Sequence, residues 1–236
     1  MFDTRCEISS ILHGESDRLV VIVGPSCIHD YHACMEYAAR LKAFAAQLSD
    51  DLLVVMQINF ESAATSGWKG LINDPDLDGT FRINKGFRHA RQLLLDVNRI
   101  GLPVGCEYLD TITPQFIADL VCWAVVGEST CASRAHRELA SGLSTPVGFV
   151  KDSVRDEIRG GERVALDAVR ASGAPHAFLS VSKQGVAGIV ETTGNRDCHV
   201  CAPCGMHQLE KTPRMLSTLL PGASCCRTGR ASGAKD

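Results

Sequence analysis

Short apolar runs alternate with amphipathic helical segments along most of this 236-residue chain. The first run, Leu19 to Val23, is continuously apolar and ends at Gly24 and Pro25, as a strand does when both of its faces are buried in a parallel sheet. A helical pattern follows over residues 32–48, and a second apolar run covers residues 52–58. This repeated order of strand and helix predicts parallel βα units and an α/β fold.

The same order continues through the first 200 residues. Further strands are expected at 104–109, 121–126 and 146–150, further helices at 84–100, 113–120, 135–141 and 162–171, and a hairpin over 178–181 and 187–191. The pattern contains about five or six strands, whereas a closed (β/α)8 barrel needs eight, so the sequence predicts an incomplete TIM barrel. An open doubly wound sheet is the less favoured alternative, because no glycine-rich dinucleotide fingerprint follows the first strand.

Composition divides the chain into three segments. Residues 1–18 form an N-terminal extension and residues 19–200 form the partial barrel. Residues 201–236 form a divergent tail that carries three prolines and no apolar repeat beyond Met215 to Leu220. We therefore expect the tail to be irregular and to add no pair of barrel strands.

Charge and composition favour small-molecule partners. The formal net charge of −3 gives no basic face for nucleic acid. The longest apolar run, Leu120 to Val126, is far shorter than the roughly 20 residues that span a bilayer. No secretory signal opens the chain, so we expect a cytoplasmic protein that does not bind membranes. The odd count of 11 cysteines argues against a disulfide framework and predicts reduced thiols.

Several long strings carry a specific resemblance. They are GP-S-C-IHD at 24–30, GWKGLINDPDLDG at 67–79, INKG at 83–86, LDTITPQ at 109–115, HRELASGLS at 136–144, PVGF at 146–149, APH-FLSV at 174–181 and GN-DCH at 194–199. On these strings the chain resembles the type I 3-deoxy-D-arabino-heptulosonate-7-phosphate (DAHP) synthases over roughly residues 19 to 200. The resemblance implies a (β/α) barrel transferase that joins phosphoenolpyruvate to erythrose 4-phosphate with a divalent metal such as Mn or Fe. It also implies a role in the first step of the shikimate pathway to chorismate and the aromatic amino acids.

The resemblance implies four substrate-binding positions. Glu107 transfers directly, as the residue near phosphoenolpyruvate, and Gly127 follows the fourth strand. Gln57 stands where the family has a substrate-binding Arg, and Ser62, Ala63 and Ala64 replace a Lys-Pro-Arg string; Lys69 is the cation retained nearby. Because charge-assisted hydrogen bonds are about twice as strong as neutral ones, these replacements are expected to weaken phosphate binding.

Two chemical groups are displaced by one residue relative to the family. The metal-binding Cys of the family corresponds to Ser26, with Cys27 next to it, and the catalytic Lys corresponds to Val150, with Lys151 next to it. A one-residue shift along an extended strand reverses the direction of the side chain unless a bulge re-aims it. The favoured interpretation of Cys27 is therefore a buried structural thiol.

The resemblance also implies a feedback pocket for an aromatic amino acid. The residues that correspond to this regulatory pocket are Asp110, Pro114, Gln115 and Ser144. Thr113 followed by Pro114 is in addition a good start for a helix, so a structural role is an equal alternative.

Three functional hypotheses remain open from the sequence. The first is a DAHP synthase-like enzyme with impaired activity, and the second is a non-catalytic relative, a pseudoenzyme that regulates or binds an intact synthase. The third, less favoured, is a zinc or iron–sulfur site at Cys198, Cys201 and Cys204, with His207 nearby. An unclosed barrel leaves apolar surface uncovered, so a homo- or hetero-oligomer is expected in every case.

Overall fold

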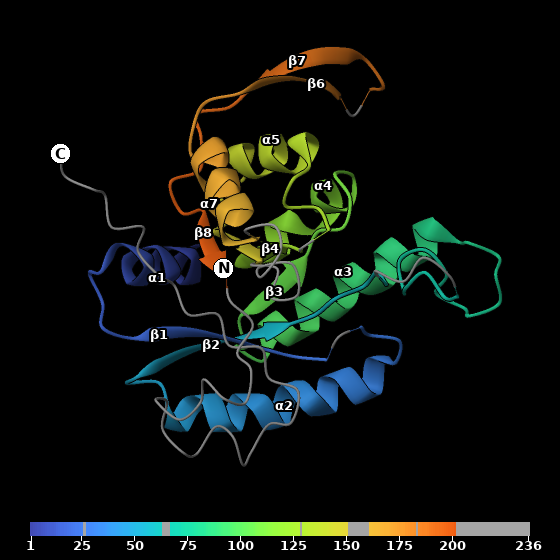
Figure 1. Ribbon diagram of the computed structural model, residues 1–236. Coiled ribbons are helices and arrows are strands. Elements are labelled where there is room, and N and C mark those ends of the chain that lie inside the picture. The colour runs from blue at the N-terminus through green and yellow to red at the C-terminus, as the bar shows by residue number, and fades with distance from the viewer. Residues whose placement is uncertain (26, 63–66, 128, 151–160, 183, 202–236) are drawn as a thin grey trace.

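The computed structural model describes residues 1–25, 27–62, 67–127, 129–150, 161–182 and 184–201, and it shows a curved parallel sheet covered by helices (Figure 1). Neighbouring strands of the six-stranded sheet pair in parallel, in the order β1-β2-β3-β4-β5-β8. The sheet is an open half-barrel, because β1 and β8 lie at its two edges. The strand bounds are β1 Leu19–Val23, β2 Leu52–Gln57, β3 Val104–Glu107, β4 Trp123–Val126, β5 Val147–Val150 and β8 His199–Cys201.

Helices cover the outer face of the sheet. Side chains from the helices and from alternate strand positions, such as Val54 of β2 and Phe149 of β5, form one large buried cluster. The Asp30 carboxylate caps the first of these helices by accepting a hydrogen bond from the Ala33 backbone N–H at 2.7 Å. The helices are α2 Tyr31–Gln47, α3 Ile83–Arg99, α4 Thr113–Ile117, α5 Arg134–Gly142 and α7 Gly161–Ser172, with a 3-10 turn, η1, at Ala118–Leu120.

An N-terminal helix, α1 (Phe2–His13), packs against the inner face of the sheet. Its buried residues Ile8 and Ile11 join a second apolar cluster with Val20, Ile22 and other inward-facing strand residues. The helix ends at Gly14, whose φ of 76° is the left-handed conformation that glycine adopts without strain. The first 18 residues, expected only as an extension, therefore supply part of the core.

Trp123 fills the centre of the inner face. A Cβ atom at Gly105 would lie 2.9 Å from the indole ring, and one at Gly148 would lie 2.8 Å from it, so only glycine leaves room for this ring. The indole Nε1 donates a hydrogen bond to Nε2 of His199 at 3.1 Å, and His199 Nδ1 donates to the Asp197 carbonyl at 3.0 Å. Burial lowers the pKa of His199, which keeps the ring neutral in this arrangement.

The structure confirms the α/β class and the incomplete barrel. The partial barrel was expected to end at residue 200, and the sheet runs one residue further, because Cys201 is the last residue of β8. The rest of the tail, residues 202–236, lies outside the described residues. Among the described cysteines seven are free thiols, as expected, but Cys201 is disulfide-bonded, which corrects the expectation for that residue. No helix within the described ranges has the length and apolar character that a membrane crossing requires.

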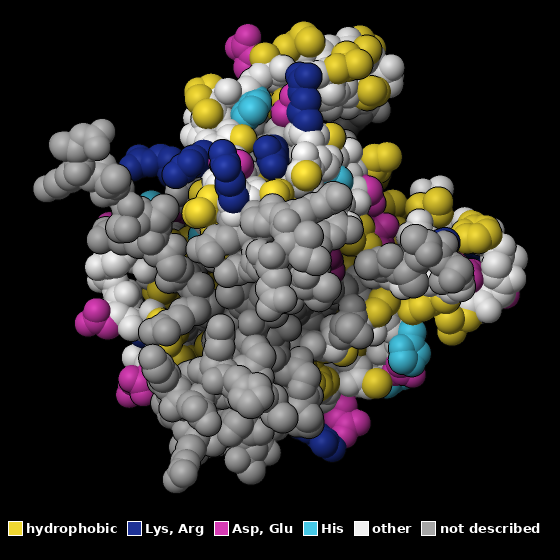
Figure 2. Space-filling view, in the orientation of Figure 1, with side chains coloured by type: hydrophobic (Ala, Val, Ile, Leu, Met, Phe, Trp, Pro, Cys, Tyr) yellow, Lys and Arg dark blue, Asp and Glu magenta, His cyan; other side chains and the backbone are white. Residues whose placement is uncertain are grey.

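A hairpin of β6 (Ala177–Val181) and β7 (Ala187–Glu191) projects from the helical layer (Figure 1). Leu179 pairs with Ile189 across the two strands, and these side chains are 71% and 67% exposed. Figure 2 shows the hydrophobic side chains gathered on this projection. A two-stranded ribbon with an apolar face is marginally stable alone, so it favours contact with another chain.

Replacing Leu179 by Lys should therefore weaken self-association and lower the average molecular mass of the particles in solution. The substitution places a charge at the centre of the exposed apolar face of the hairpin. Sedimentation velocity at about 20 μM would measure the change. Leu77→Lys is the matched control, since Leu77 is also exposed but lies outside the hairpin. A wild-type chain that sediments as a single monomer would contradict the expectation of self-association.

Candidate functional site

The carboxyl ends of β2, β3 and β4 lie side by side at one rim of the half-barrel, because these strands are parallel neighbours. Gln57 is the last residue of β2, Glu107 is the last residue of β3, and Gly127 directly follows β4. Three of the four substrate positions that the resemblance implies therefore meet at the rim. This is the end of a (β/α) barrel at which active sites are built.

Asn59 holds the rim side chains in place. Its Oδ1 accepts hydrogen bonds from the Glu107 backbone N–H at 3.0 Å and from Gln57 Nε2 at 3.3 Å, while its Nδ2 donates to the Glu107 carboxylate at 3.3 Å. The Asn59 carbonyl accepts from the Ile28 N–H at 2.9 Å, which attaches the segment after β1. Because Asn59 is buried, these bonds fix the orientation of Gln57 and Glu107.

Gly127 leaves the space that the Glu107 carboxylate occupies. A Cβ atom at position 127 would lie 2.4 Å from Oε1 of Glu107. The Gly127 carbonyl also accepts hydrogen bonds from the N–H groups of Thr130 and Cys131, both at 3.0 Å. Burial raises the pKa of Glu107, because the ionised form loses hydration there.

A small cavity of about 240 Å³ lies beside this network and is lined by residues that include Glu61, Lys69 and Asp110. Asn73 Nδ2 donates a hydrogen bond to Oε1 of Glu61 at 3.1 Å. Burial, followed by the charge of Asp110, raises the pKa of Glu61 to about 7. Lys69, the fourth implied substrate position, thus lines a cavity that it shares with carboxyl groups.

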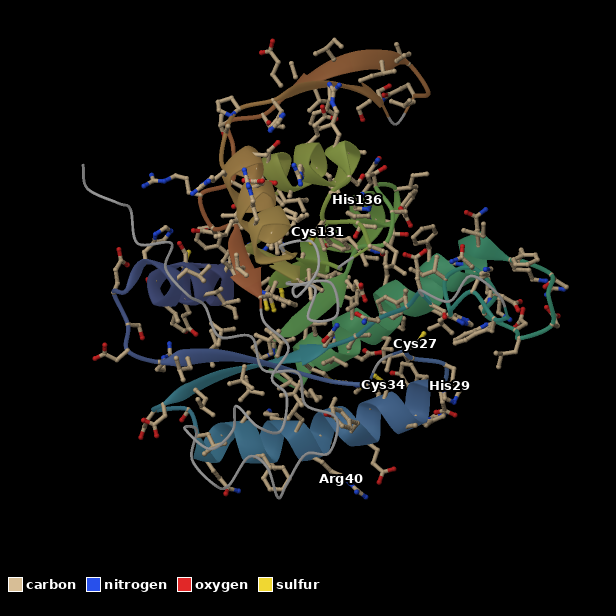
Figure 3. All side chains as sticks on the ribbon, in the orientation of Figure 1. Cys27, His29, Cys34, Arg40, Cys131 and His136 are labelled. Carbon is tan, nitrogen blue, oxygen red and sulfur yellow. The ribbon has the colours of Figure 1, made fainter. Side chains whose placement is uncertain are left out.

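Cys27 lies in the segment between β1 and α2, in the region where Figure 3 also labels His29 and Cys34. Its thiol donates a hydrogen bond to the Glu61 carbonyl at 3.6 Å, and burial raises its pKa, which disfavours the thiolate that binds metals. Within the described ranges, no three His, Cys, Asp or Glu side chains are grouped so that they could hold a metal ion. The surroundings of Cys27 therefore favour a protonated thiol that is bonded to a backbone carbonyl.

Two further predicted sites fall partly or wholly outside the described residues. Lys151, the candidate catalytic residue, lies outside them, and so do Cys204 and His207 of the alternative metal site. Of the remaining two cysteines of that site, Cys198 is a free thiol and Cys201 is disulfide-bonded. A disulfide sulfur is not a thiolate ligand, which leaves Cys198 as the one described cysteine of that group with a free thiol.

A larger pocket of about 710 Å³ lies among α5, the segment after it and the β6–β7 hairpin. Its wall combines apolar side chains, such as Phe178 and Val190, with polar and charged ones, such as Asp197. A cavity of this size, whose wall mixes polar and apolar groups, can hold a small organic ligand. Gln115 and Ser144 both line it, so two of the four regulatory positions meet there.

The other two regulatory positions lie elsewhere. The Asp110 carboxylate caps α4 by accepting from the N–H and the hydroxyl of Thr113, at 2.7 and 2.9 Å, and it lines the small rim cavity. Pro114 is buried in the first turn of α4 and lines a neighbouring cavity of about 570 Å³. Gln115 and Ser144 thus share the 710 Å³ pocket, Pro114 shares the neighbouring cavity with Gln115, and Asp110 lies at the rim cavity.

Asn59 is the rim residue that the sequence analysis missed. It follows Gln57 by two positions, and residues two apart in an extended segment point to the same side. This two-residue spacing was the feature of the sequence that could have placed Asn59 beside Gln57. It is a weak indication, because a single Asn after a strand is also common in turns.

Together, these features define a class: an α/β chain of the (β/α) barrel type with polar groups at the carboxyl ends of its strands. The model of the DAHP synthetase I family matches residues 3–218, and the chain belongs to that family. The matched region begins within α1, which agrees with the packing of that helix on the sheet.

Known relatives support this assignment. The Phe-sensitive phospho-2-dehydro-3-deoxyheptonate aldolase of Escherichia coli K12 is 53% identical over 197 residues, which cover 83% of this chain and 55% of the relative. The Trp-sensitive enzyme of the same strain is 49% identical over 199 residues, or 84% of this chain and 56% of the relative. This chain thus spans about half the length of these relatives.

A solved structure shows the same architecture. The phospho-2-dehydro-3-deoxyheptonate aldolase from Francisella tularensis SCHU S4 superposes with a TM-score of 0.78 at 42% identity. The superposition covers 92% of this chain and 64% of that one. The half-barrel therefore corresponds to part of a larger barrel fold.

The raised pKa of Glu61 predicts a change in stability with pH. The folded chain holds this proton more tightly than the unfolded chain, in which the pKa is near 4.5, so the free energy of unfolding should fall as the pH rises from 4.5 to 7. Because glutamine does not titrate, the free energy of unfolding of Glu61→Gln should fall by about 2 kcal/mol less than that of the wild type over this pH range. Urea unfolding at pH 5 and pH 8 measures it, with the exposed Glu36→Gln as the control. An unchanged pH dependence in Glu61→Gln would refute the assignment.

Proposed function

We propose that this chain acts in a DAHP synthase-like condensation of phosphoenolpyruvate with erythrose 4-phosphate, with impaired turnover. The observation that carries the proposal is the Gln57–Asn59–Glu107 network at the rim of a half-barrel of this family. The network presents an amide and a carboxyl group in fixed positions. Fixed polar groups are what a site needs to orient a substrate for carbon–carbon bond formation.

The charge balance of the rim supports the impaired turnover. The carboxyl groups of Glu61, Glu107 and Asp110 lie at or next to the rim, and Lys69 is the cation that lines the same cavity as Glu61 and Asp110. Phosphate groups are bound most strongly by Arg and Lys side chains, and a buried carboxylate repels them. Gln57 can donate one hydrogen bond to a phosphate or carboxylate, but it brings no charge.

A divalent metal, Mn or Fe by the family resemblance, would supply polarisation of the aldehyde oxygen when bound. Cys27, displaced by one residue from the family's metal ligand, would have to give up a proton whose pKa is raised by burial before it could hold the metal. The groups of this chain that act on the substrate directly in the proposal are the Gln57 amide, which donates a hydrogen bond, and the Glu107 carboxyl, which can hold a proton because burial raises its pKa.

A second function is supported by a different observation. The 710 Å³ pocket is formed within this chain, while by the family resemblance Gln57 stands at the rim where the family has an Arg. A non-catalytic relative that binds an aromatic amino acid and regulates an intact synthase would need the pocket and not the rim. This alternative and the first proposal share the ligand pocket and differ in turnover.

Restoring one cation should strengthen phosphoenolpyruvate binding. Gln57→Arg is expected to lower the Kd by about tenfold, because a charge-assisted hydrogen bond replaces a neutral one. Isothermal titration with phosphoenolpyruvate measures the change, and Gln47→Arg on the exposed side of α2 is the matched control. No binding by either wild type or Gln57→Arg would refute the substrate site.

Turnover of both substrates with Mn²⁺ by the wild type would refute the non-catalytic alternative.

We propose that the 710 Å³ pocket takes an aromatic amino acid as effector. The support is the lining by Gln115, Ser144 and Phe178, together with two relatives that are named as Phe-sensitive and Trp-sensitive enzymes. An aromatic ring would pack against Phe178 and Val190, and the zwitterionic end would meet polar groups such as Asp197 and Arg196.

Gln115→Ala should weaken effector binding by about fivefold, because it removes a hydrogen-bonding amide from the pocket wall. Isothermal titration with L-phenylalanine, L-tyrosine and L-tryptophan measures the affinity. Gln92→Ala is the control, since Gln92 lies on the exposed side of α3, where it bonds to Asp96. Equal affinities in wild type and Gln115→Ala would remove Gln115 from the proposed site.

A further inference from the structure

We infer that α1 is a positioning element of the effector pocket, in which Arg5 and His13 hold the pocket residues Ser144 and Asp197. The inference rests on the proposed effector function of that pocket. It is drawn from two separate polar contacts between α1 and the pocket wall, together with the burial of α1 on the inner face of the sheet.

Arg5 makes the first contact. Its Nη1 donates a hydrogen bond to the Ser144 hydroxyl oxygen at 2.8 Å, and its Nε and Nη2 donate to the Val121 carbonyl at 3.1 and 2.7 Å. A further bond from Nη2 reaches the Ala118 carbonyl at 2.5 Å. The planar guanidinium is thus held by several acceptors at once, which leaves little freedom at Ser144.

The contact with Arg5 also sets the hydrogen-bonding role of Ser144. A serine hydroxyl has one hydrogen to donate and two lone pairs to accept. Arg5 donates to the oxygen, and among the described residues no side chain or carbonyl accepts the Ser144 hydroxyl hydrogen. Since Ser144 lines the pocket, that hydrogen can be donated to a ligand carboxylate.

His13 and Ser9 make the second contact. His13 Nε2 lies 2.8 Å from Oδ1 of Asp197, and the Ser9 hydroxyl donates to the same oxygen at 2.9 Å. Asp197 lines the pocket, and its backbone N–H donates to Asn195 Oδ1 at 3.0 Å. The last turns of α1 therefore fix one acidic wall of the pocket, where a ligand ammonium group would bind.

The apolar side of α1 connects these contacts to the sheet. Ile8 is fully buried and Ile11 nearly so, in the cluster that contains Trp123 and the inward residues of β1 and β2. Arg5 and His13 lie on either side of these two residues along the helix. A shift of α1 would therefore change both the pocket wall and the packing of the inner face. By thermodynamic linkage, a ligand that binds better when α1 is docked must stabilise the docked helix by the same factor.

Arg5→Gln tests the inference. It should weaken the binding of L-phenylalanine, or of whichever aromatic amino acid the wild type binds, by about fivefold or more, because the Ser144 hydroxyl is no longer oriented. Arg18→Gln is the matched control. Arg18 also contacts α1, through Glu7 at 3.5 Å, but it does not line or reach the pocket.

A second measurement separates positioning from simple stability. In the wild type, saturating ligand should slow backbone hydrogen exchange over residues 2–13, and this protection should be lost in Arg5→Gln and kept in Arg18→Gln. If Arg5→Gln does not fold, His13→Gln replaces it, because His13 is an exposed residue at the helix end. Its expected effect has the same direction.

The outcomes distinguish the inference from the function on which it rests. If the wild type binds none of the three aromatic amino acids, the effector function fails and the inference fails with it. If the wild type binds one of them and the folded Arg5→Gln or His13→Gln variant binds it equally well, with α1 protected as before, the inference alone is overturned.

Discussion

A parallel sheet must be covered on both faces, and every other feature of this chain depends on how that requirement is met. The helices α2, α3, α5 and α7 cover the outer face and connect strands that run in parallel, so the carboxyl ends of neighbouring strands lie side by side at one rim. In a closed barrel the side chains of all the strands would fill the inside. Here α1 packs against the inner face through Ile8 and Ile11, next to an indole that fits because Gly105 and Gly148 lack side chains.

The chemistry of the rim follows from which groups can remain ionised there. Glu107 and Glu61 are both held at raised pKa values by burial, and Glu61 also by the neighbouring charge of Asp110. The Glu61 carboxyl group is therefore partly protonated near neutral pH, and the cation Lys69 lines the cavity that Glu61 shares with Asp110. The rim therefore combines the parallel strand ends of the family's fold with carboxyl groups that hold their protons more tightly than free ones.

The strand and helix pattern could be predicted because buried strands and amphipathic helices have different periods. The family resemblance nominated Gln57, Glu107 and Gly127, and their meeting at the rim follows from the parallel order of β2, β3 and β4. Helix α1 was missed because it buries few large apolar side chains, and β8 because it is a three-residue strand that contains a histidine. The sequence pattern also did not reveal that Asp110 lines the rim cavity whereas Gln115 lines the 710 Å³ pocket, because the chain turns between these two residues. The Arg5–Ser144 contact joins residues 139 positions apart, which no local pattern reveals.

The segment after β3 serves both sites, which explains why the sequence alone did not separate them. Glu107 belongs to the rim, Asp110 lines the rim cavity, and Thr111, the next residue, lines the 710 Å³ pocket together with Gln115. The Asp110 carboxylate caps α4, so the position of this helix depends on the same group that faces Glu61. The turn from Glu107 to Gln115 is therefore shared by the rim and the 710 Å³ pocket, and α1 contacts two further residues of that pocket, Ser144 and Asp197.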